Sequence, residues 1–275
     1  MAAVIDPEVA AFYGRGFEED RLHPTGEARL EYVRTLELHE RLLPPPPARV
    51  LDVGGATGVY AAPLCERGYT VHLVDPIALH VDRANESARE RSLARFSAAV
   101  GDARDLDAQG TGYDAVLLLG PLYHLTDQSD RHRALAQAVG VSKPGAIVVA
   151  AGISRFASLI DGLKRGWLQD ATFRSIVEAD LRDGQHRNAA LDGRPEFFTT
   201  AYFHMPSELE AEARAAGLND VRLYAVEGPA WIVEQPDDLD NQVFAARATE
   251  TEPSLLAASA HLLVTGTTPA APPKP

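Results

Sequence analysis

The feature that most constrains the fold is the stretch of residues 49–60, with the sequence RVLDVGGATGVY. Its short apolar run predicts a buried strand, and Gly54, Gly55 and Gly58 interrupt this run before a helical pattern begins at Val59. Glycine permits a tight turn and a close approach of the backbone to a ligand. The N–H groups at the start of a helix have no partner within the helix. The stretch therefore predicts a strand, a ligand-binding turn and a helix.

Residues 49–151 alternate between strand-like and helix-like segments. Apolar runs predict five strands, at residues 50–53, 70–74, 95–100, 113–119 and 146–151. This alternation predicts βαβ units with right-handed crossovers, and so an α/β fold with a doubly wound sheet. Ligands in such sheets bind outside the carboxyl ends of the strands, where the glycine-rich turn lies.

The other parts of the chain show different patterns. We predict an N-terminal helical cap (1–48), a lid or substrate-binding insertion (152–205), a C-terminal part of the core (206–266) with its own insertion (227–259), and a disordered tail (267–275). In the cap, helices are expected over residues 6–13 and 27–43. The lid is expected to hold two or three helices and an extended piece. Strands are expected at 221–226 and 261–265, with a helix near 253–259 between them.

Composition excludes several classes of protein. The net charge of −13 argues against a nucleic-acid partner, because phosphate binding requires a basic patch. The single cysteine, Cys65, has no partner for an internal disulfide and no companions for a metal site, so we expect no metal. No segment has the pattern of a signal peptide or the length of a membrane span. We therefore expect a cytoplasmic protein with no membrane partner.

The turn at residues 52–58 fits the pattern D-x-G-x-G-x-G better than the dinucleotide pattern G-x-G-x-x-G, with Ala56 where glycine is usual. In this the chain resembles class I S-adenosylmethionine (SAM)-dependent methyltransferases. The resemblance covers residues 49–151 and the last two strands. It implies a seven-stranded Rossmann-like sheet that ends in an antiparallel hairpin, with SAM as the cofactor. A glycine-rich loop in another kind of α/β protein is the alternative.

The resemblance assigns residues to the two ends of SAM. Asp52, Gly54, Gly55 and Gly58 would hold the methionine half, and Gly120 would lie next to the reactive sulfonium. In similar enzymes an N-terminal helix folds over the cofactor and supplies an arginine. In this sequence the corresponding candidates for contact with the SAM carboxylate are Tyr13 and Arg29 of the cap.

Acidic residues also follow the second and third predicted strands. Asp75, which precedes Pro76, would accept hydrogen bonds from both ribose hydroxyls, since a carboxylate only accepts. The same arrangement binds the ribose of NAD in dehydrogenases, so Asp75 alone does not separate the two classes. Asp102 would accept from the adenine amino group, and the backbone of Ala103 would complete that contact.

The segment Gly120–Leu125 reads GPLYHL and is similar to a segment of bacterial small-molecule methyltransferases. It differs from the N/D-P-P-Y/F loop of enzymes that methylate nucleic-acid amines, because glycine replaces the asparagine or aspartate. Methyl transfer requires in-line alignment of the acceptor and removal of a proton. Tyr123 is expected to line the transfer site, and His124 and His204 are the candidate general bases.

Aromatic residues in the two insertions are candidates for a substrate wall: Phe156, Trp167, Phe198, Tyr202 and Trp231. The other interpretation is that they form small local cores. We predict an enzyme that methylates O or N of a small molecule, as a monomer or a homodimer. The alternatives are a protein or nucleic-acid methyltransferase, a non-catalytic SAM-binding regulator or assembly protein, and, more remotely, an NAD-dependent oxidoreductase.

Overall fold

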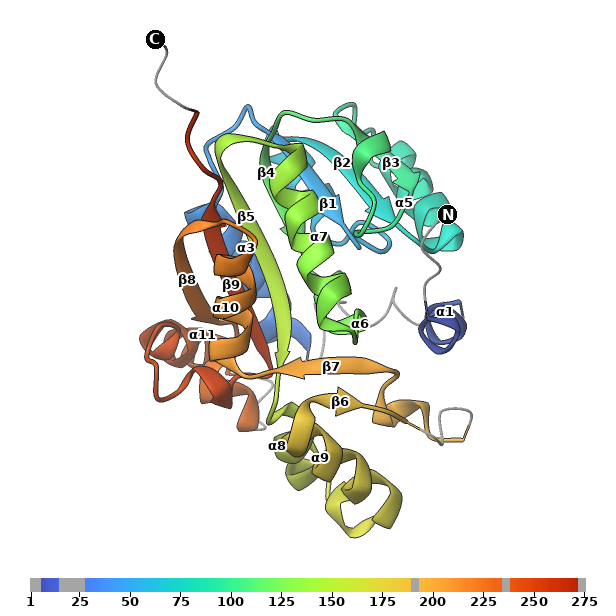
Figure 1. The fold of residues 1–275 in the computed structure, drawn as a ribbon, viewed down its shortest axis with the longest axis vertical. Coiled ribbons are helices and arrows are strands. Elements are labelled where there is room, and N and C mark those ends of the chain that lie inside the picture. Colours follow the sequence, from blue (N-terminus) through green and yellow to red (C-terminus); the bar gives the residue numbers. More distant parts are fainter. Residues whose placement is uncertain (1–5, 15–27, 189–192, 234–237, 272–275) are drawn as a thin grey trace.

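A computed structural model describes residues 6–14, 28–188, 193–233 and 238–271. Within these ranges a mostly parallel β-sheet runs through the centre of the molecule, with helices on both faces (Figure 1). The prediction of a Rossmann-like α/β fold is confirmed. In the described ranges, no helix has both the length and the apolar character needed to cross a membrane.

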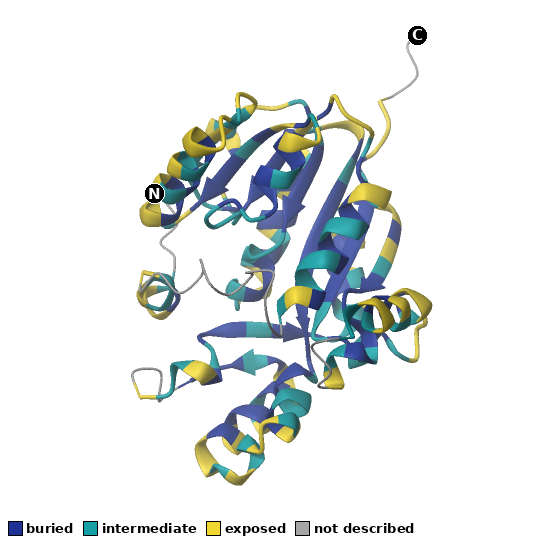
Figure 2. Cartoon of the chain, turned by 180° about the vertical axis from the view of Figure 1, so that it is seen from behind, coloured by how far each residue is buried: buried dark blue, intermediate teal, exposed yellow. Residues whose placement is uncertain are grey.

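Five parallel strands form the first part of the sheet. They are β1 (Arg49–Val53), β2 (Thr70–Asp75), β3 (Phe96–Val100), β4 (Tyr113–Leu118) and β5 (Ser142–Ser154). Their order is β3-β2-β1-β4-β5, and all neighbouring pairs are parallel. The middle strands are buried on both sides, which explains their continuous apolar sequences (Figure 2). β5 extends beyond its predicted end because it also pairs with a strand of the lid.

The last two predicted strands form the expected antiparallel hairpin. β8 (Asn219–Ala225) pairs with β9 (His261–Thr267), and β9 also pairs with β5. Residues 152–205, the segment expected to form a lid, add two short strands, β6 (Gln185–His186) and β7 (Ala201–His204). The described sheet therefore has nine strands, and the predicted count of seven was too low. β7 is the extended piece expected in the lid.

Helices cover the two faces of the sheet. α3 (Ala28–Leu42), α4 (Ala61–Glu66) and α5 (Ala78–Glu90) place Leu38, Leu64 and Ala84 in one apolar core. α7 (Gln128–Val141) and α10 (Pro206–Ala215) place Leu135 and Leu209 in the core on the opposite face. The strands feed both cores by alternation, as Val50 and Leu51 of β1 do.

Other helices surround the carboxyl edge of the sheet. They are α1 (Pro7–Tyr13), α6 (Pro121–His124), α8 (Ala157–Lys164), α9 (Ala171–Asp183) and α11 (Leu239–Thr249). Short 3-10 turns lie at η1 (Asp107–Gln109), η2 (Trp167–Gln169), η3 (Pro195–Phe197), η4 (Gly228–Ile232) and η5 (Leu256–Ala258). α1 begins as predicted, because Asp6 accepts a hydrogen bond from the Glu8 N–H at 2.8 Å.

Two predictions near the C-terminus need correction. The helix expected near residues 253–259 is only the short turn η5, and α11 was not predicted. α11 buries only Val243 and Ala246, which gives a weak apolar pattern. The disordered tail was placed too early, because Thr267 belongs to β9 and Thr268 is buried. Thr268 Oγ1 donates to the Lys143 carbonyl at 2.6 Å. Residues 272–275 lie outside the described ranges.

Candidate active site

A cavity of about 280 Å³ lies at the carboxyl ends of β1, β2 and β4 and the loop after β3. Below it is called the cofactor cavity. Its lining includes the three predicted acids, Asp52, Asp75 and Asp102, and α1 contributes Tyr13. The predicted residues Gly54, Gly55, Pro76, Ala103 and Gly120 also line it. The topology thus brings four separate strand ends to one site, as expected for a doubly wound sheet.

The turn after β1 needs glycine for space as well as conformation. Gly54 has a φ of +72°, and a Cβ there would lie 2.7 Å from the Pro121 ring. A Cβ at Gly55 would lie 2.6 Å from Oδ2 of Asp52. Ala56 has a φ of +47°, a conformation that favours glycine. The structure therefore explains why glycine is usual at this position of the pattern.

Asp52 is buried and lines the cofactor cavity. Neither carboxylate oxygen has a hydrogen-bond partner within the described part of the chain. Burial, together with the charge of Asp75, raises the pKa of Asp52 to about 7. An unpartnered buried carboxylate is costly unless a cation or donor approaches it. The ammonium group of SAM has the chemistry to satisfy it, so this part of the cavity fits the methionine end of SAM.

Asp75 is buried and already accepts three hydrogen bonds. Oδ1 accepts from the Ile77 N–H at 2.9 Å and lies 3.1 Å from Nδ1 of His80. Oδ2 accepts from the Ala56 N–H at 3.0 Å. A carboxylate has about four acceptor positions. This arrangement leaves room for one ribose hydroxyl, and a second requires His80 to move. His80 was not predicted as part of the site.

Asp102 is held by a neighbouring arginine. Arg104 donates to Asp102 through Nε at 2.9 Å and through a terminal nitrogen at 2.7 Å. The same guanidinium pairs with Asp130 at 2.6 Å. All three residues line the cofactor cavity. Arg104 thus fixes the carboxylate that was predicted to read the adenine amino group, and the sequence pattern gave no sign of this role.

α1 lies over the cofactor cavity and is tied to the lid. The Tyr13 hydroxyl is 2.7 Å from Nε2 of His124, and Nδ1 of His124 is 3.2 Å from the Thr200 carbonyl. Nδ1 therefore donates to Thr200, and Nε2 accepts from Tyr13. Thr200 Oγ1 also contacts the carboxylate of Glu8 on α1. The predicted base His124 lines the cofactor cavity, with its acceptor nitrogen occupied by Tyr13.

A second, larger cavity of about 740 Å³ lies between the core, the lid and the insertion after β8. Below it is called the acceptor cavity. It shares Tyr13 and Tyr123 with the cofactor cavity. Its lining is rich in aromatic rings: Trp167, Phe173, Phe197, Phe198, Phe203 and Trp231. Three of the rings predicted from the sequence are therefore present, namely Trp167, Phe198 and Trp231.

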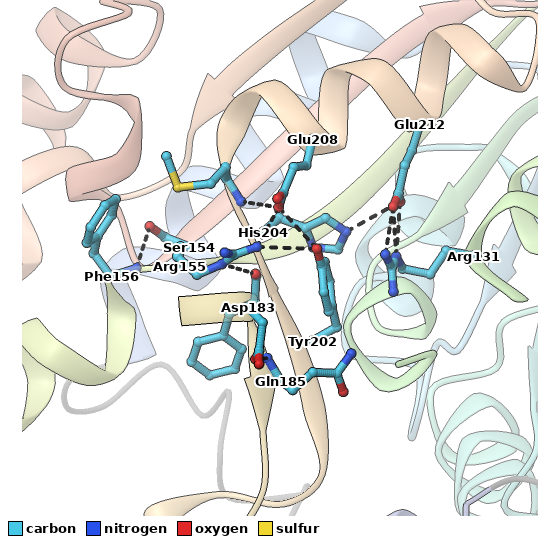
Figure 3. Close-up of polar contacts among 12 residues, drawn as sticks. Arg131, Ser154, Arg155, Phe156, Asp183, Gln185, Tyr202, His204, Glu208 and Glu212 are labelled. Atoms are coloured by element: carbon cyan, nitrogen blue, oxygen red, sulfur yellow. Dashed lines mark hydrogen bonds and ion pairs between the residues drawn. The ribbon is translucent and has the colours of Figure 1, made fainter. Parts of the chain in front are cut away.

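The structure corrects the predictions for His204 and Tyr202, which line neither cavity within the described residues. His204 is fully buried, with Nε2 3.4 Å from Glu212, which pairs with Arg131 (Figure 3). The Arg131 guanidinium lies 3.7 Å from the Tyr202 ring centre. Burial lowers the pKa of His204 despite the carboxylate nearby. Alternation along β7 turns Tyr202 and His204 toward this network, while Phe203 lines the acceptor cavity.

Three further assignments also change. Arg29, predicted to bind the SAM carboxylate, lines the acceptor cavity and not the cofactor cavity. Phe156 precedes α8 and lines neither of the two cavities as described. Gly58 has a φ of +87°, and a Cβ there would lie 3.7 Å from Leu73 and Ala84. Gly58 therefore shapes the packing of the turn against the sheet and does not line the cofactor cavity.

A cluster of three polar side chains in the acceptor cavity was not predicted from the sequence. Glu31, Glu227 and His261 line this cavity, and their side-chain ligand atoms lie within 4.8 Å of one another. They come from α3, from the segment after β8 and from the start of β9. No spacing or motif connects positions so far apart in the chain. Only the antiparallel hairpin brings two of them together.

Comparisons with known proteins agree with this site. Residues 50–145 match a family described as a methyltransferase domain. Uncharacterized methyltransferases of Mycobacterium tuberculosis and Mycobacterium bovis are 29% identical over 206 residues, 74% of this chain and 76% of theirs. A ubiquinone biosynthesis O-methyltransferase of Methylocella silvestris is 27% identical over 193 residues, 61% of this chain and 74% of its own. The solved CcbJ methyltransferase of Streptomyces caelestis has a TM-score of 0.59 at 18% identity, covering 94% of this chain and 98% of its own.

The matched domain spans β1 to the start of β5, the part of the sheet whose strand ends form the cofactor cavity. The domain match, the relatives and the fold together support a class I SAM-dependent methyltransferase. The protein is an enzyme, and SAM is its cofactor.

Proposed function

We propose that this enzyme transfers the SAM methyl group to an oxygen or nitrogen of a small-molecule acceptor. The observation that carries the proposal is the meeting of two cavities at Tyr13 and Tyr123. SAM occupies the cofactor cavity, and the acceptor occupies the larger one. The methyl group is already bonded to a positive sulfur. The protein therefore has to align the two reactants at roughly 3–3.5 Å and accept a proton.

Each part of SAM has a proposed partner in the cofactor cavity. Asp52 and the turn after it bind the methionine end, and Gly120 faces the sulfonium. Asp75, with Pro76 beside it, binds the ribose. Asp102, held by Arg104, and the backbone of Ala103 bind the adenine. Tyr13 closes the cavity from α1, tied down through His124.

The size and the walls of the acceptor cavity support a small acceptor. About 740 Å³ is within the usual range for a small-molecule pocket, and the lining is largely apolar and aromatic. The lid of residues 152–205 supplies most of these rings, so we propose that it selects the acceptor. The Methylocella silvestris relative is named as an O-methyltransferase, which favours oxygen. The net charge of −13 opposes a nucleic-acid acceptor.

The main competing function is a SAM-binding protein without transfer activity. In such a protein we expect side chains such as Phe198 of the lid or Trp231 of the insertion after β8 to fill the acceptor cavity. Both residues instead lie on the wall of an open cavity. This favours catalysis.

The test has two stages. Calorimetry first measures the binding of SAM and of NADH to the purified protein, with SAM expected to bind. Pools of small hydroxyl and amine compounds are then incubated with the enzyme and methyl-labelled SAM, and labelled products are sought by mass spectrometry. Binding of NADH in place of SAM contradicts the cofactor. Transfer of the label only to protein or nucleic acid contradicts the small-molecule acceptor.

A further inference from the structure

The acceptor cavity contains a histidine that is held by a buried carboxylate. We propose that His261, oriented by Glu227, is the general base that takes the proton from an acceptor hydroxyl, which makes the enzyme an O-methyltransferase. This rests on the proposed function, because it assumes that the acceptor occupies this cavity. It adds a base at a position that the sequence did not indicate.

Hydrogen bonds around Glu227 hold the pair in place. Glu227 Oε1 is 2.6 Å from Nδ1 of His261. Glu227 Oε2 accepts from Ser259 Oγ at 2.7 Å and from the His261 backbone N–H at 3.0 Å. The bond at Nδ1 places the ring proton there and leaves the basic lone pair on Nε2. A base held in this way by a third group is the arrangement that proton-abstracting sites require.

The charge of Glu227 suits this role. Burial alone raises the pKa of Glu227, but the charge of His261 and the hydrogen bonds from His261 and Ser259 outweigh it, so the pKa is lowered. Glu227 is therefore ionised when His261 carries a proton, and this charge stabilises the protonated ring. Glu31 of α3 faces the same ring, 3.8 Å from Nδ1. The other titratable or charged side chains lining the cavity are Tyr13, Arg29, Tyr123, Asp161, Lys164, Arg165, His186 and Glu196.

The same three side chains, Glu31, Glu227 and His261, have the composition of a cation site, but their geometry favours a base. The 2.6 Å contact between Glu227 and Nδ1 is a hydrogen bond, and it occupies the nitrogen nearest both carboxylates. Both oxygens of Glu227 already accept from donors of this chain. A metal ion would have to displace these bonds.

The step balances without any other reactant. The acceptor O–H proton moves to Nε2 of His261, and the oxygen forms a bond to the methyl carbon. The bond between that carbon and the sulfur breaks, and its electron pair stays on sulfur as a neutral thioether. The products are a methyl ether, S-adenosylhomocysteine and a protonated His261, which later loses its proton to water. A phenol needs such a base, because phenolic hydroxyls have a pKa of about 10. The aromatic walls provide a surface for its ring.

The experiment uses catechol and 2-naphthol as phenolic probes, with release of S-adenosylhomocysteine measured from pH 5.5 to 9. His261→Asn is expected to lower kcat about 100-fold or more, with the Kd of SAM unchanged. Glu227→Gln is expected to lower kcat less and to move the acidic limb of the pH profile to lower pH, because His261 loses its anionic partner. His132→Asn, on α7 and outside the lining of both cavities, is the matched control and should remain within about twofold of wild type.

A readout without an acceptor completes the test. NMR follows the titration of the His261 imidazole in the SAM-bound protein, and Glu227→Gln should lower its midpoint. An unchanged midpoint overturns the proposal, as does a His261→Asn enzyme with the rate and pH profile of wild type. Binding of one equivalent of Zn²⁺ or Mg²⁺ that is lost in Glu31→Gln makes these residues metal ligands and also overturns it. Failure of the wild-type protein to bind SAM contradicts the proposed function instead.

Discussion

The cofactor cavity and the acceptor cavity lie side by side but are built in different ways. Apart from Tyr13 of α1, the predicted walls of the cofactor cavity lie at or just beyond the ends of apolar strands, as at Asp52, Asp75 and Asp102. The acceptor cavity takes its walls from α3, α8, β7, the turn η4 and the start of β9. Short segments of local sequence therefore determine the walls of the cofactor cavity. The acceptor cavity exists only once distant parts of the chain have folded together.

The two cavities also differ in chemistry. The lining of the cofactor cavity includes the three carboxylates predicted at the strand ends, which suit a ligand with an ammonium group, hydroxyls and an amino group. The acceptor cavity is walled by aromatic rings and contains one hydrogen-bonded histidine–glutamate pair. If each cavity binds one of the two reactants, a substitution in one cavity should change the affinity for the reactant bound there. The affinity for the reactant in the other cavity should stay unchanged.

The largest effect is expected at Asp75. Asp75→Ala removes the ribose acceptor and also the partner of the Ala56 and Ile77 N–H groups. Hydrogen bonds to a charged group contribute about 1.5–3 kcal/mol each, so we expect the Kd of SAM to rise about 100-fold or more in calorimetry. Asp82→Ala, on the exposed side of α5, is the control for loss of an acid. Circular dichroism checks the fold, and an unchanged SAM affinity would remove Asp75 from the ribose site.

The next largest effect is expected from a substitution in the acceptor cavity. Trp231→Ala removes an aromatic wall of the acceptor cavity, and Trp231 is not among the described residues that line the cofactor cavity. Loss of the buried ring contact is expected to weaken the acceptor by about 1.5–3 kcal/mol, or roughly 10- to 100-fold in KM. The Kd of SAM should stay unchanged. An equal loss of SAM affinity would show that the two cavities are not separable.

The sequence predicted one side of this comparison much better than the other. The five parallel strands and the three acids were predictable because apolar runs and strand-end acids are local signals. The hairpin was expected only from the resemblance to class I methyltransferases. The wall of the acceptor cavity was not predictable from such signals. Tyr202 and His204 were chosen on β7, but Phe203 between them faces the cavity, and a strand pattern alone does not reveal which face is which. The pairing of Glu227 with His261 depends on the antiparallel hairpin, which no short motif encodes.

The affinity for SAM is expected to depend on pH through Asp52 in the cofactor cavity. The pKa of Asp52 is raised to about 7, so near pH 6 most of this carboxyl is protonated and cannot pair with the SAM ammonium. We expect the Kd of SAM to be about tenfold weaker at pH 6 than at pH 8, since one pKa unit corresponds to a tenfold change. Asp52→Asn should abolish this dependence. Calorimetry in buffers with different ionisation enthalpies reports the proton released on binding.

Without SAM, the same group predicts the opposite trend in stability. Asp52 in the folded protein keeps its proton at pH values where the unfolded chain has lost it. The free energy of unfolding should therefore fall as the pH rises from about 4 to about 7, and then level off. Urea unfolding of the wild type and of Asp52→Asn across this range measures the difference. Parallel curves for the two proteins would show that Asp52 does not carry the effect.

The smallest effect is expected at Ala56, where the turn of the cofactor cavity departs from the usual glycine. Ala56 has a φ of +47°, and a left-handed conformation costs a residue with a Cβ about 1–2 kcal/mol. Ala56→Gly removes this strain but gives the unfolded chain more freedom, which offsets about 0.4–1 kcal/mol. We expect a net stabilisation of about 0.5 kcal/mol in urea unfolding. Ala136→Gly, exposed on the helix α7, lacks the strain and should instead lose about 1 kcal/mol. Equal losses in both variants would mean that the turn tolerates alanine without strain, and that only the glycines at 54 and 55 constrain the cofactor cavity.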